Sequence, residues 1–426
     1  MLYHAYEMTH AALSPMRAAA RVGQELVRNP YNILANSYGN RAVSAALAMF
    51  MQATRRYGKP EFGLATTEVD GVETPVIEEI VWSDSFCDLL HFRRDSAAAA
   101  ARNDPKLLIV APMSGHYATL LRGTVKAMLP EHDVYITDWV DARDVPLSRG
   151  GFDLDDYSDY LVRMIETLSR DGERIAVLAV CQPGVPALVA SSLMAMDDNP
   201  LRPAALILMG SPIDTARNPK QPNELAQSHP LSWFENNVVV RVPWPCAGAV
   251  RRVYPGFLQL SGFLSMNLDR HVDAHVTQFR NLVRGDGESA EAHDRFYDEY
   301  MAVMDLSAEF YLQTIERVFQ KRELALGEYR HRGRLVEPGA MSDIGLMTIE
   351  GEKDDITGLG QTEAAQDLAT GLPDALRAHV VVEGVGHYGV FNGSRWRGMT
   401  QPKVRDFIRA RRRPVEASAG VAVLRP

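Results

Sequence analysis

Cysteine is scarce in this chain, whose 426 residues include Cys87, Cys181 and Cys246 and no others of their kind. Three cysteines do not make a disulfide framework, and their scarcity is typical of a reducing compartment. The N-terminus lacks the basic segment followed by an apolar segment that marks a signal peptide. The most apolar N-terminal stretch, residues 42–53, is too short to span a bilayer. The sequence therefore predicts a cytoplasmic protein without a transmembrane segment.

An excess of positive charge is also lacking. The chain has 45 Lys and Arg residues against 54 Asp and Glu residues, which gives a net charge of −9. This balance argues against general nucleic-acid binding. Basic residues gather at 405–413, which we interpret as a solvated helix end and tail.

Motifs for cofactors and metals are missing as well. Residues 148–151, Ser-Arg-Gly-Gly, lack the spacing and the Gly-Lys pair of a P-loop, and no Gly-x-Gly-x-x-Gly motif follows the first strands. His271 and His275 are four residues apart on a predicted helix, but neither a third ligand nor the catalytic Glu of a zinc protease accompanies them. The sequence therefore predicts no cofactor and no metal.

What is present is an alternation of strands and helices. Residues 1–57 are predicted to be helical, and residues 64–93 to form a β-hairpin. Beyond them, buried strands are predicted at 107–111, 133–139, 174–181, 204–209, 344–350 and 378–383, and helices at 116–129, 154–168, 185–196 and 394–411. Such alternation predicts an α/β fold with a mainly parallel sheet and helices on both faces.

The alternation stops between residues 209 and 344, where Pro-rich turns and helical segments follow, notably 302–320. We interpret this stretch as a largely helical cap inserted over the strand ends. The predicted organisation is an N-terminal helical extension (1–63), a core in two parts (64–210 and 341–413), the cap (211–340) and a C-terminal tail (414–426).

The most informative residue is Cys181. An apolar, strand-like run ends abruptly at this cysteine, and Gly184 and an apolar, helix-like segment follow at once. This is the outline of a nucleophile elbow, in which a nucleophile occupies a sharp turn between a strand and a helix. Cys181 is therefore predicted to attack acyl groups, with sulfur in place of the usual serine oxygen.

A catalytic acid and base follow in the chain order of an α/β-hydrolase. His387, which follows the last predicted strand, is the candidate base. Asp354 and Asp355 both follow the preceding strand, and either can orient the imidazole. We favour Asp354, because a Gly-x-x-Asp turn is the commoner arrangement after this strand. The predicted α/β-hydrolase thus carries a Cys-Asp-His triad.

Donors to an oxyanion are expected from backbone N–H groups. One is that of Gln182, the residue after the nucleophile. The second lies in the loop of residues 111–115, where Met113 is favoured and Ser114 is the alternative.

Further contacts to the substrate are predicted on both sides of this loop. Ser114 and His116 lie in or next to it, although a structural role for His116 is favoured. In the cap, the candidate contacts for an apolar chain are Trp233, Trp244, Phe257 and Phe263, although packing within the cap is the favoured interpretation for most of these aromatic residues. Cys87 and Cys246 lack comparable neighbours and are interpreted as packing residues.

Together these residues resemble the intracellular poly(3-hydroxybutyrate) depolymerases, which are cysteine α/β-hydrolases of polyester-storing bacteria. The resemblance covers nearly the whole chain. Its most specific motifs are Val-Cys-Gln-Pro-Gly at 180–184 and Gly-His-Tyr-Gly-Val-Phe-Asn-Gly at 386–393. Further matches are Met-Leu-Tyr at 1–3, Leu-Ser-Pro at 13–15, Lys-Pro-Glu-Phe-Gly at 59–63, Ala-Pro-Met-Ser-Gly-His-Tyr at 111–117 and Gly-Glu-Lys-Asp-Asp-Ile-Thr-Gly at 351–358.

The resemblance implies Cys181 as nucleophile, Asp354 as acid and His387 as base. It also implies hydrolysis, without a metal, of amorphous polyhydroxyalkanoate granules and of 3-hydroxybutyrate oligomers, by a cytoplasmic protein associated with storage granules. Whether water or coenzyme A accepts the acyl group stays open, as do the preferred side-chain length and the choice between endo and exo cleavage.

Two other functions are compatible with the sequence. A polyester synthase-like acyltransferase uses a similar residue set, but its usual Gly-x-Cys-x-Gly box and the His after its acid are both absent here. A non-catalytic granule-associated protein is the other alternative, in which an apolar stripe on the N-terminal helices lies on a polymer or lipid surface. Packing of these helices against the core is the favoured interpretation.

Overall fold

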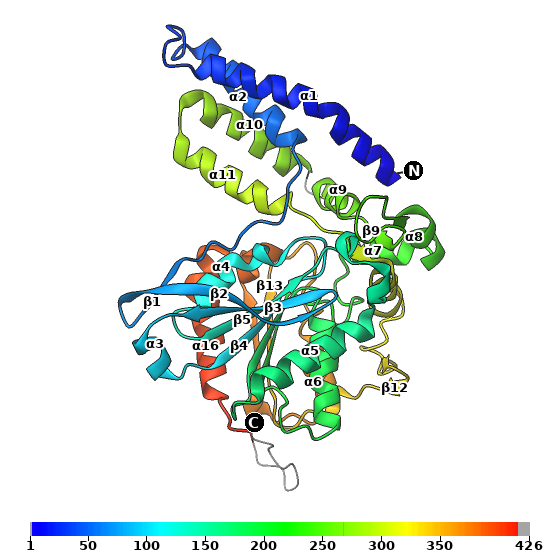
Figure 1. Cartoon of the computed structure of the whole chain (residues 1–426). Coiled ribbons are helices and arrows are strands. Elements are labelled where there is room, and N and C mark those ends of the chain that lie inside the picture. Colours follow the sequence, from blue (N-terminus) through cyan, green and yellow to red (C-terminus); the bar gives the residue numbers. More distant parts are fainter. Residues whose placement is uncertain (1, 267, 416–426) are drawn as a thin grey trace.

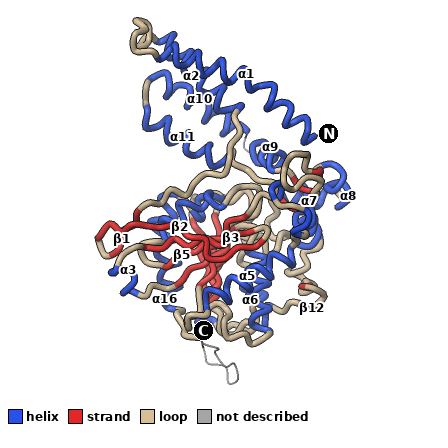
Figure 2. Tube along the Cα trace, in the orientation of Figure 1, coloured by secondary structure: helices blue, strands red, loops and turns tan. Residues whose placement is uncertain are grey.

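The computed structural model describes residues 2–266 and 268–415 of the chain (Figure 1). Within these residues, nine strands form one sheet in the order β1-β2-β3-β5-β4-β6-β7-β13-β14. Figure 2 shows the sheet in the middle of the larger body of the molecule, with helices around it. The strands are β1 (Thr66–Val69), β2 (Val72–Asp84), β3 (Cys87–Arg94), β4 (Lys106–Val110), β5 (Asp133–Trp139), β6 (Ala176–Val180), β7 (Ala205–Met209), β13 (Gly345–Gly351) and β14 (Arg377–Val382).

The sheet is antiparallel at one edge and parallel elsewhere. β1, β2, β3 and β5 pair antiparallel in that order, whereas all the other neighbours pair in parallel. Every residue of β6 and β7 is buried, as expected for apolar strands covered on both faces. This strand order, with a sharp turn from β6 into a helix, is that of the α/β-hydrolase fold. The predicted fold class is therefore confirmed.

Helices cover both faces of the sheet. They are α3 (Ala97–Arg102), the 3₁₀ turn η1 (Ala118–Leu121), α4 (Arg122–Met128), α5 (Leu154–Ser169), α6 (Gly184–Met196), α13 (Ala364–Leu368), α14 (His387–Phe391), α15 (Gly393–Arg395), the π-helical turn η7 (Trp396–Thr400) and α16 (Gln401–Ala410). α5 and α6 pack together on one face, and α4 contacts α16 on the other (Figure 1).

A long, largely helical insertion separates β7 from β13. Its elements are α7 (Gln221–Ser228), α8 (Leu231–Asn237), β8 (Val240–Arg241), β9 (Arg252–Tyr254), α9 (Gly256–Met266), α10 (Leu268–Arg284), α11 (Gly287–Tyr300), β10 (Leu306–Ser307), α12 (Ala308–Gln313), the π-helical η4 (Thr314–Gln320), β11 (Arg330–His331) and β12 (Arg334–Leu335). β10, β9 and β8 pair into a small sheet, and β11 and β12 form a hairpin.

Two predicted helices are less regular than expected. The closing segment is divided into α15, η7 and α16, and the fully buried Trp396 opens its π-helical turn. Residues 302–307 are not helical, because β10 pairs with β9 before α12 begins. Here tertiary pairing overrides the local helix preference.

The N-terminal helices and part of the insertion form a helical projection above the sheet (Figure 1). α1 (Leu2–Arg28) packs on α2 (Tyr38–Thr54), α2 packs on α10, and α10 pairs with α11. The start of α1 also contacts the insertion. Tyr3 Oη donates a hydrogen bond to Asp305 at 2.9 Å, and the ring of Tyr6 stacks on Phe257 with 4.2 Å between centroids.

One side of α1, the outer stripe, is apolar and exposed. It follows helical spacing and consists of Met8, Ala12, Met16, Ala19, Val22 and Leu26. The loop after α1 also exposes Tyr31, Ile33 and Leu34. The sequence favours packing of these helices on the core, but the structure leaves the outer stripe in solvent because α1 packs on α2 instead. Among the described helices, none is long and apolar enough to cross a membrane.

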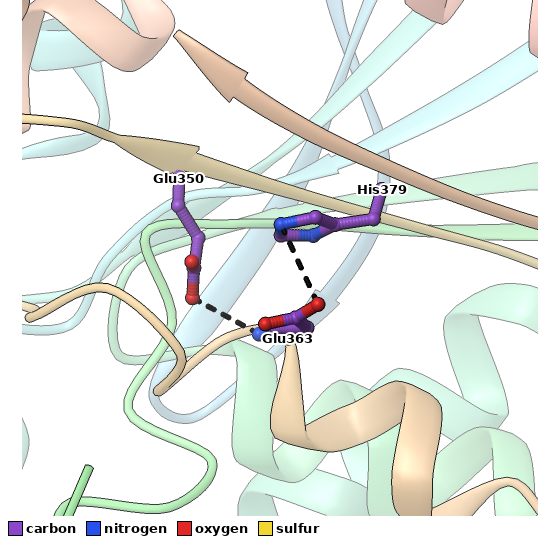
Figure 3. A group of neighbouring side chains, drawn as sticks. All are labelled: Glu350, Glu363 and His379. Atoms are coloured by element: carbon purple, nitrogen blue, oxygen red, sulfur yellow. Dashed lines mark hydrogen bonds and ion pairs between the residues drawn. The ribbon is translucent and has the colours of Figure 1, made fainter. Parts of the chain in front are cut away.

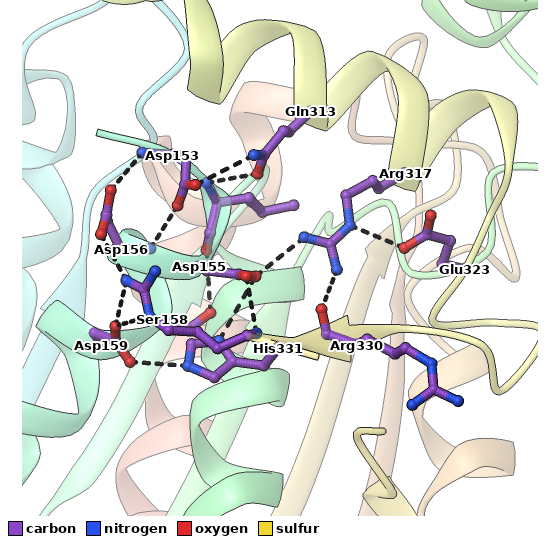
Figure 4. A network of polar contacts seen from close by, with 12 residues as sticks. Asp153, Asp155, Asp156, Ser158, Asp159, Gln313, Arg317, Glu323, Arg330 and His331 are labelled. Atoms are coloured by element: carbon purple, nitrogen blue, oxygen red, sulfur yellow. Dashed lines mark hydrogen bonds and ion pairs between the residues drawn. The ribbon is translucent and has the colours of Figure 1, made fainter. Parts of the chain in front are cut away.

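A polar network fastens the end of the insertion to α5 (Figure 4). His331 Nε2 bonds to Asp159 at 2.9 Å, and its Nδ1 lies 3.6 Å from Asp155. Arg332 pairs with Asp156 and Asp159 at 2.6 and 2.7 Å. Burial lowers the pKa of His331, but the hydrogen bonds to Asp155 and Asp159 and their charges outweigh burial and raise this pKa to about 9. The β11–β12 hairpin is therefore held by a charged histidine at neutral pH.

Candidate active site

Cys181 occupies the sharp turn between β6 and α6. Its φ of 68° lies in the left-handed region, which a residue other than glycine adopts only under strain. The Cys181 N–H donates to the carbonyl of Met209 at 2.7 Å, which fixes the turn to the neighbouring strand. A Cβ on Gly184 would collide with Ser211, so only glycine fits where α6 passes β7. The half-buried Cys181 side chain lines a cavity at this end of the sheet.

The ends of β13 and β14 bring an acid and an imidazole to the same place. His387 Nδ1 lies 2.8 Å from Asp354 Oδ2, and both side chains are buried. The other carboxylate oxygen of Asp354 accepts the N–H groups of Ile356 and Thr357 at 2.9 and 2.8 Å. These amides point Asp354, and not the exposed Asp355, at the imidazole.

The side chains of His387 and Cys181 line the same cavity, and interaction with Cys181 helps to raise the pKa of His387. Since Nδ1 is taken by Asp354, Nε2 is the ring nitrogen left to interact with the sulfur. Burial lowers the pKa of His387, but the charges of Asp354 and of a Cys181 thiolate, together with the hydrogen bonds, outweigh burial and hold this pKa well above its usual range. The arrangement therefore favours a protonated imidazole beside the sulfur.

The loop after β4 brings the Met113 N–H close to the elbow. The loop starts at Ala111, whose N–H donates to Thr137 Oγ1 at 2.9 Å and whose carbonyl accepts Trp139 Nε1–H at 2.9 Å. The Met113 N–H points at the side-chain oxygen of Gln182, at 3.4 Å. An oxygen that entered from a substrate would compete with this long, weak hydrogen bond for the Met113 amide.

The first cavity, beside Cys181, has a volume of about 190 Å³. Besides Cys181, Gln182 and His387, its lining is mostly apolar and comes largely from the insertion. The apolar walls include Leu120, Phe263, Leu306, Phe310, Ile315 and Phe319. α12 and η4 supply three of these residues, so the aromatic side chains of this helical segment are site residues that the sequence analysis did not single out. Their spacing along one helical segment was the available signal.

Of the other predicted substrate contacts, some line the first cavity and some do not. Ser114 and His116 line the first cavity, and buried His116 also bonds to the carbonyl of Tyr300 at 3.0 Å through Nε2. Burial lowers the pKa of His116 to about 4, so this imidazole is neutral at pH 7. Trp233 and Trp244 do not line the cavity. Trp233 packs against its neighbours on α8, and Trp244 is 85% exposed, so neither is retained as a substrate contact.

The remaining cysteines lie outside the first cavity. Cys87 is fully buried in the core, where burial raises the pKa of its thiol well above the usual range. Cys246 is half-buried, and burial is also the main cause of its raised thiol pKa. Neither environment favours a reactive thiolate.

A group of acidic and imidazole side chains near β13 has a structural explanation (Figure 3). Glu350, Glu363 and His379 lie close enough together to hold a cation. The carboxylate of Glu350, however, already accepts the N–H groups of Gly360, Thr362 and Glu363 at 2.7 to 3.0 Å. Its hydrogen bonds hold the segment after the Asp354 loop, and no metal site is inferred from this group.

Comparison with known proteins gives a family match over the second half of the chain. A family model described as PHB de-polymerase C-terminus matches residues 210–412, a range that contains Asp354 and His387 but begins after Cys181.

The poly(3-hydroxyalkanoate) polymerase subunit PhaC of Haloferax mediterranei is 24% identical to this chain over 356 residues. The match covers 81% of this chain and 66% of that protein, so the chain spans slightly less than two thirds of its relative.

Solved structures with a similar arrangement include a hydrolase from Pseudomonas aeruginosa PA01 (12% identity, TM-score 0.43, 78% of this chain and 97% of that chain). They also include a thermophilic esterase from Thermogutta terrifontis (14% identity, TM-score 0.40, 82% of this chain and 97% of that chain).

Proposed function

We propose that this protein is an ester hydrolase with a cysteine nucleophile that degrades polyhydroxyalkanoate, with 3-hydroxybutyrate polyester as its substrate class. The observation that carries the proposal is the position of Cys181 on a strained turn at an apolar cavity that it shares with His387, whose imidazole is hydrogen-bonded to buried Asp354. The match of residues 210–412 to a PHB depolymerase family model supports the choice of polyester.

Acylation begins at the sulfur. The Cys181 thiolate attacks the ester carbonyl carbon, and the Gln182 and Met113 N–H groups stabilise the negative charge that develops on the carbonyl oxygen. The carbon–alkoxy oxygen bond then breaks, and His387 Nε2–H gives its proton to the departing oxygen. A thioester on Cys181 and a free hydroxyl group result. Asp354 keeps the imidazole oriented throughout and stabilises its positive charge.

Deacylation uses the same groups in reverse. The neutral imidazole takes a proton from water, the resulting hydroxide attacks the thioester, and the Cys181 thiolate leaves. The product is a 3-hydroxyacid or a short oligomer. Coenzyme A is the alternative acceptor, and product analysis with and without coenzyme A distinguishes free acid from acyl-CoA.

We further propose that the outer stripe of α1 holds the enzyme on the polymer granule. Its exposed methyl, thioether and isopropyl groups, from Met8 to Leu26, offer an apolar surface for an insoluble polyester. The stripe lies on the helical projection, apart from the cavity-lining residues, so docking leaves the cavity lining intact.

The direct test is release of 3-hydroxybutyrate from amorphous granules. Cys181→Ala is expected to abolish this release while the protein stays folded, and Cys181→Ser to reduce it strongly, because a hydroxyl is less ionised and an ester is a poorer intermediate to cleave. Cys246→Ala, a half-buried thiol outside the cavity, serves as the matched control and should stay active. Granule hydrolysis retained in Cys181→Ala would contradict the proposal.

A polyester synthase-like acyltransferase is the second candidate, and the similarity to the Haloferax mediterranei polymerase subunit favours it. The two functions differ in the acceptor of the thioester, which is water in a hydrolase and the hydroxyl end of a growing chain in a synthase. Incubation of the purified protein with 3-hydroxybutyryl-CoA separates them. Release of monomer supports the hydrolase, and formation of polymer overturns it.

A non-catalytic granule protein is the third alternative. It shares the docking stripe with our proposal but requires no reactive thiol. A granule-bound protein that hydrolyses neither polymer nor soluble oligomers would support this alternative.

A further inference from the structure

A second cavity, of about 410 Å³, adjoins the first on the far side of His387. Both cavities are lined by Phe263, Ile356, His387 and Tyr388, whereas Cys181 lines the first cavity and not the second. The walls of the second cavity come from α10, α11 and the loops after β13 and β14. The imidazole of His387 therefore stands between two spaces, and the sulfur faces one of them.

The chemistry of ester cleavage assigns different parts of the substrate to the two sides of this imidazole. The acyl part becomes bonded to Cys181, so it must occupy the space that contains the sulfur. The alkoxy oxygen receives its proton from His387, so the departing alcohol must lie beside this imidazole and away from the thioester. The second cavity meets this requirement, because it is lined by His387 and not by Cys181.

We propose that the second cavity receives the alcohol side of the scissile ester, and that Arg270 binds the free carboxylate in which this side of the chain ends. The assignment rests on the proposed function, because it follows from the polarity of a 3-hydroxyacid polyester. In such a chain every alcohol-side segment leads to the carboxyl end. When the last ester is cleaved, the leaving group is a single 3-hydroxyacid, whose carboxylate lies only one methylene beyond the carbinol carbon.

The polar lining of the second cavity suits a carboxylate. Arg270 contributes the positive charge. Burial lowers the pKa of both His271 and His293, so these lining imidazoles are neutral at pH 7. Both ring nitrogens of His293 are buried and, within the described chain, have no hydrogen-bond partner, because Asp294 Oδ1 lies 3.6 Å away. Asp355 also lines the cavity, and because its negative charge repels a carboxylate, the carboxylate is expected beside Arg270 and away from Asp355.

The consequence is a preference for cleavage at the carboxyl end of the chain. A segment with a free carboxylate gains a charge-assisted hydrogen bond to Arg270 that an internal segment lacks. The enzyme should therefore release 3-hydroxybutyrate monomer from soluble oligomers, rather than divide them at random.

The carboxylate contact is tested with a 3-hydroxybutyrate dimer and with the methyl ester of the same dimer, which lacks the terminal charge. Arg270→Gln is expected to raise KM for the free-acid dimer about tenfold and to leave KM for the methyl ester unchanged. Arg280→Gln is the matched control, because it removes an exposed arginine of the same helix that does not line the cavity. An equal change for both dimers, or no change for either, would overturn the role of Arg270.

The position of the leaving group is tested by filling the second cavity with a larger side chain. Ala274 lines it from α10, and Ala274→Trp should hinder a hydroxyacid leaving group but not methanol. The variant is expected to lose kcat/KM for the dimer and to keep kcat/KM for methyl 3-hydroxybutyrate. Equal losses for both substrates, or none, would contradict the assignment.

Failure of this inference is distinguishable from failure of the proposed function. If the wild-type protein hydrolyses none of these esters, the proposed function fails. If it hydrolyses all of them and the variants show no selectivity, the proposed function stands and the assignment of the second cavity falls.

Discussion

The backbone of Cys181 is strained, because its φ lies in the left-handed region. A φ of 68° costs a residue other than glycine about 1–3 kcal/mol, and the surrounding structure must impose it. The hydrogen bond from the Cys181 N–H to Met209 and the close approach of Gly184 to Ser211 both act at this point. They hold the sulfur at the tip of the turn, in the cavity that His387 also lines.

Gly184→Ala should therefore weaken both the fold and the activity. The added methyl group collides with Ser211, and we expect a loss of about 1–3 kcal/mol in the free energy of unfolding. Denaturant unfolding and hydrolysis of a soluble ester measure the two effects. Adding Ser211→Gly should restore both properties, because it removes the atoms that the new methyl group meets. A single variant as stable as the wild type would show that the elbow is less tightly packed than the structure indicates.

Asp354 should control the alkaline limb of the pH profile. Its charge helps to hold the pKa of His387 well above the usual range, so the protonated imidazole persists up to that raised pKa and is lost above it. Asp354→Asn removes the charge. The alkaline limb of kcat/KM should then move to lower pH, and kcat should fall about 10²- to 10⁴-fold. An unchanged alkaline limb would mean that another group orients the imidazole.

At the residue scale, sequence reasoning predicted the types and order of the candidate site residues but not the directions in which their side chains point. For the adjacent carboxylates Asp354 and Asp355, the Gly-x-x-Asp spacing favoured Asp354 but left both open, whereas in the structure two backbone amides orient Asp354 toward the imidazole. Trp233 and Trp244 show the same limit. Their apolar rings suit a polyester, but Trp233 on α8 and Trp244 in the loop after β8 both lie outside the first cavity.

At the scale of elements, we propose that the outer stripe of α1, on the helical projection, binds the granule. Met8→Glu combined with Met16→Glu should lower co-sedimentation with amorphous granules, since two charges would have to enter an apolar contact. Hydrolysis of a soluble ester should be unchanged. Met399→Glu is the control, because Met399 is an exposed methionine in η7, outside the outer stripe. Undiminished co-sedimentation of the double variant would show that another surface binds the granule.

The β11–β12 hairpin should make stability depend on alkaline pH. The pKa of His331 is raised to about 9 in the fold, so its stabilising charge is fully present below the unfolded pKa near 6.5 and is lost as the pH rises through about 9. Allowing for solvent screening, this amounts to about 1–2 kcal/mol.

His331→Asn tests this dependence, because it removes the titrating group. The difference in Tm between wild type and variant should be largest at pH 6 and should shrink by pH 10. A difference that is the same at both values would mean that packing, and not charge, explains any loss.

Irregular elements were the part of the fold that local patterns did not predict. The π-helical turn at Trp396 forms because this side chain is buried. The residues just before α12 are extended because β10 pairs with β9. Both causes are contacts between residues far apart in sequence, which a local propensity does not report.

At the scale of the whole molecule, the strand order assembles the site. Cys181, Asp354 and His387 follow β6, β13 and β14, and parallel strands bring their carboxyl ends to one edge of the sheet. This much was predictable from the alternation of strands and helices. The two cavities were not, because their walls combine the insertion with loops of the core, and the spacing of residues in one segment does not encode such contacts.

The central claim is an acyl group carried on Cys181 during turnover. Its most direct measurement is mass spectrometry of peptides after an acid quench of the wild-type protein mixed with 3-hydroxybutyrate oligomers. We predict a 3-hydroxybutyryl adduct on the peptide that contains Cys181, and neither adduct nor product release in Cys181→Ala. An adduct on another residue, or full product release by Cys181→Ala, would contradict it.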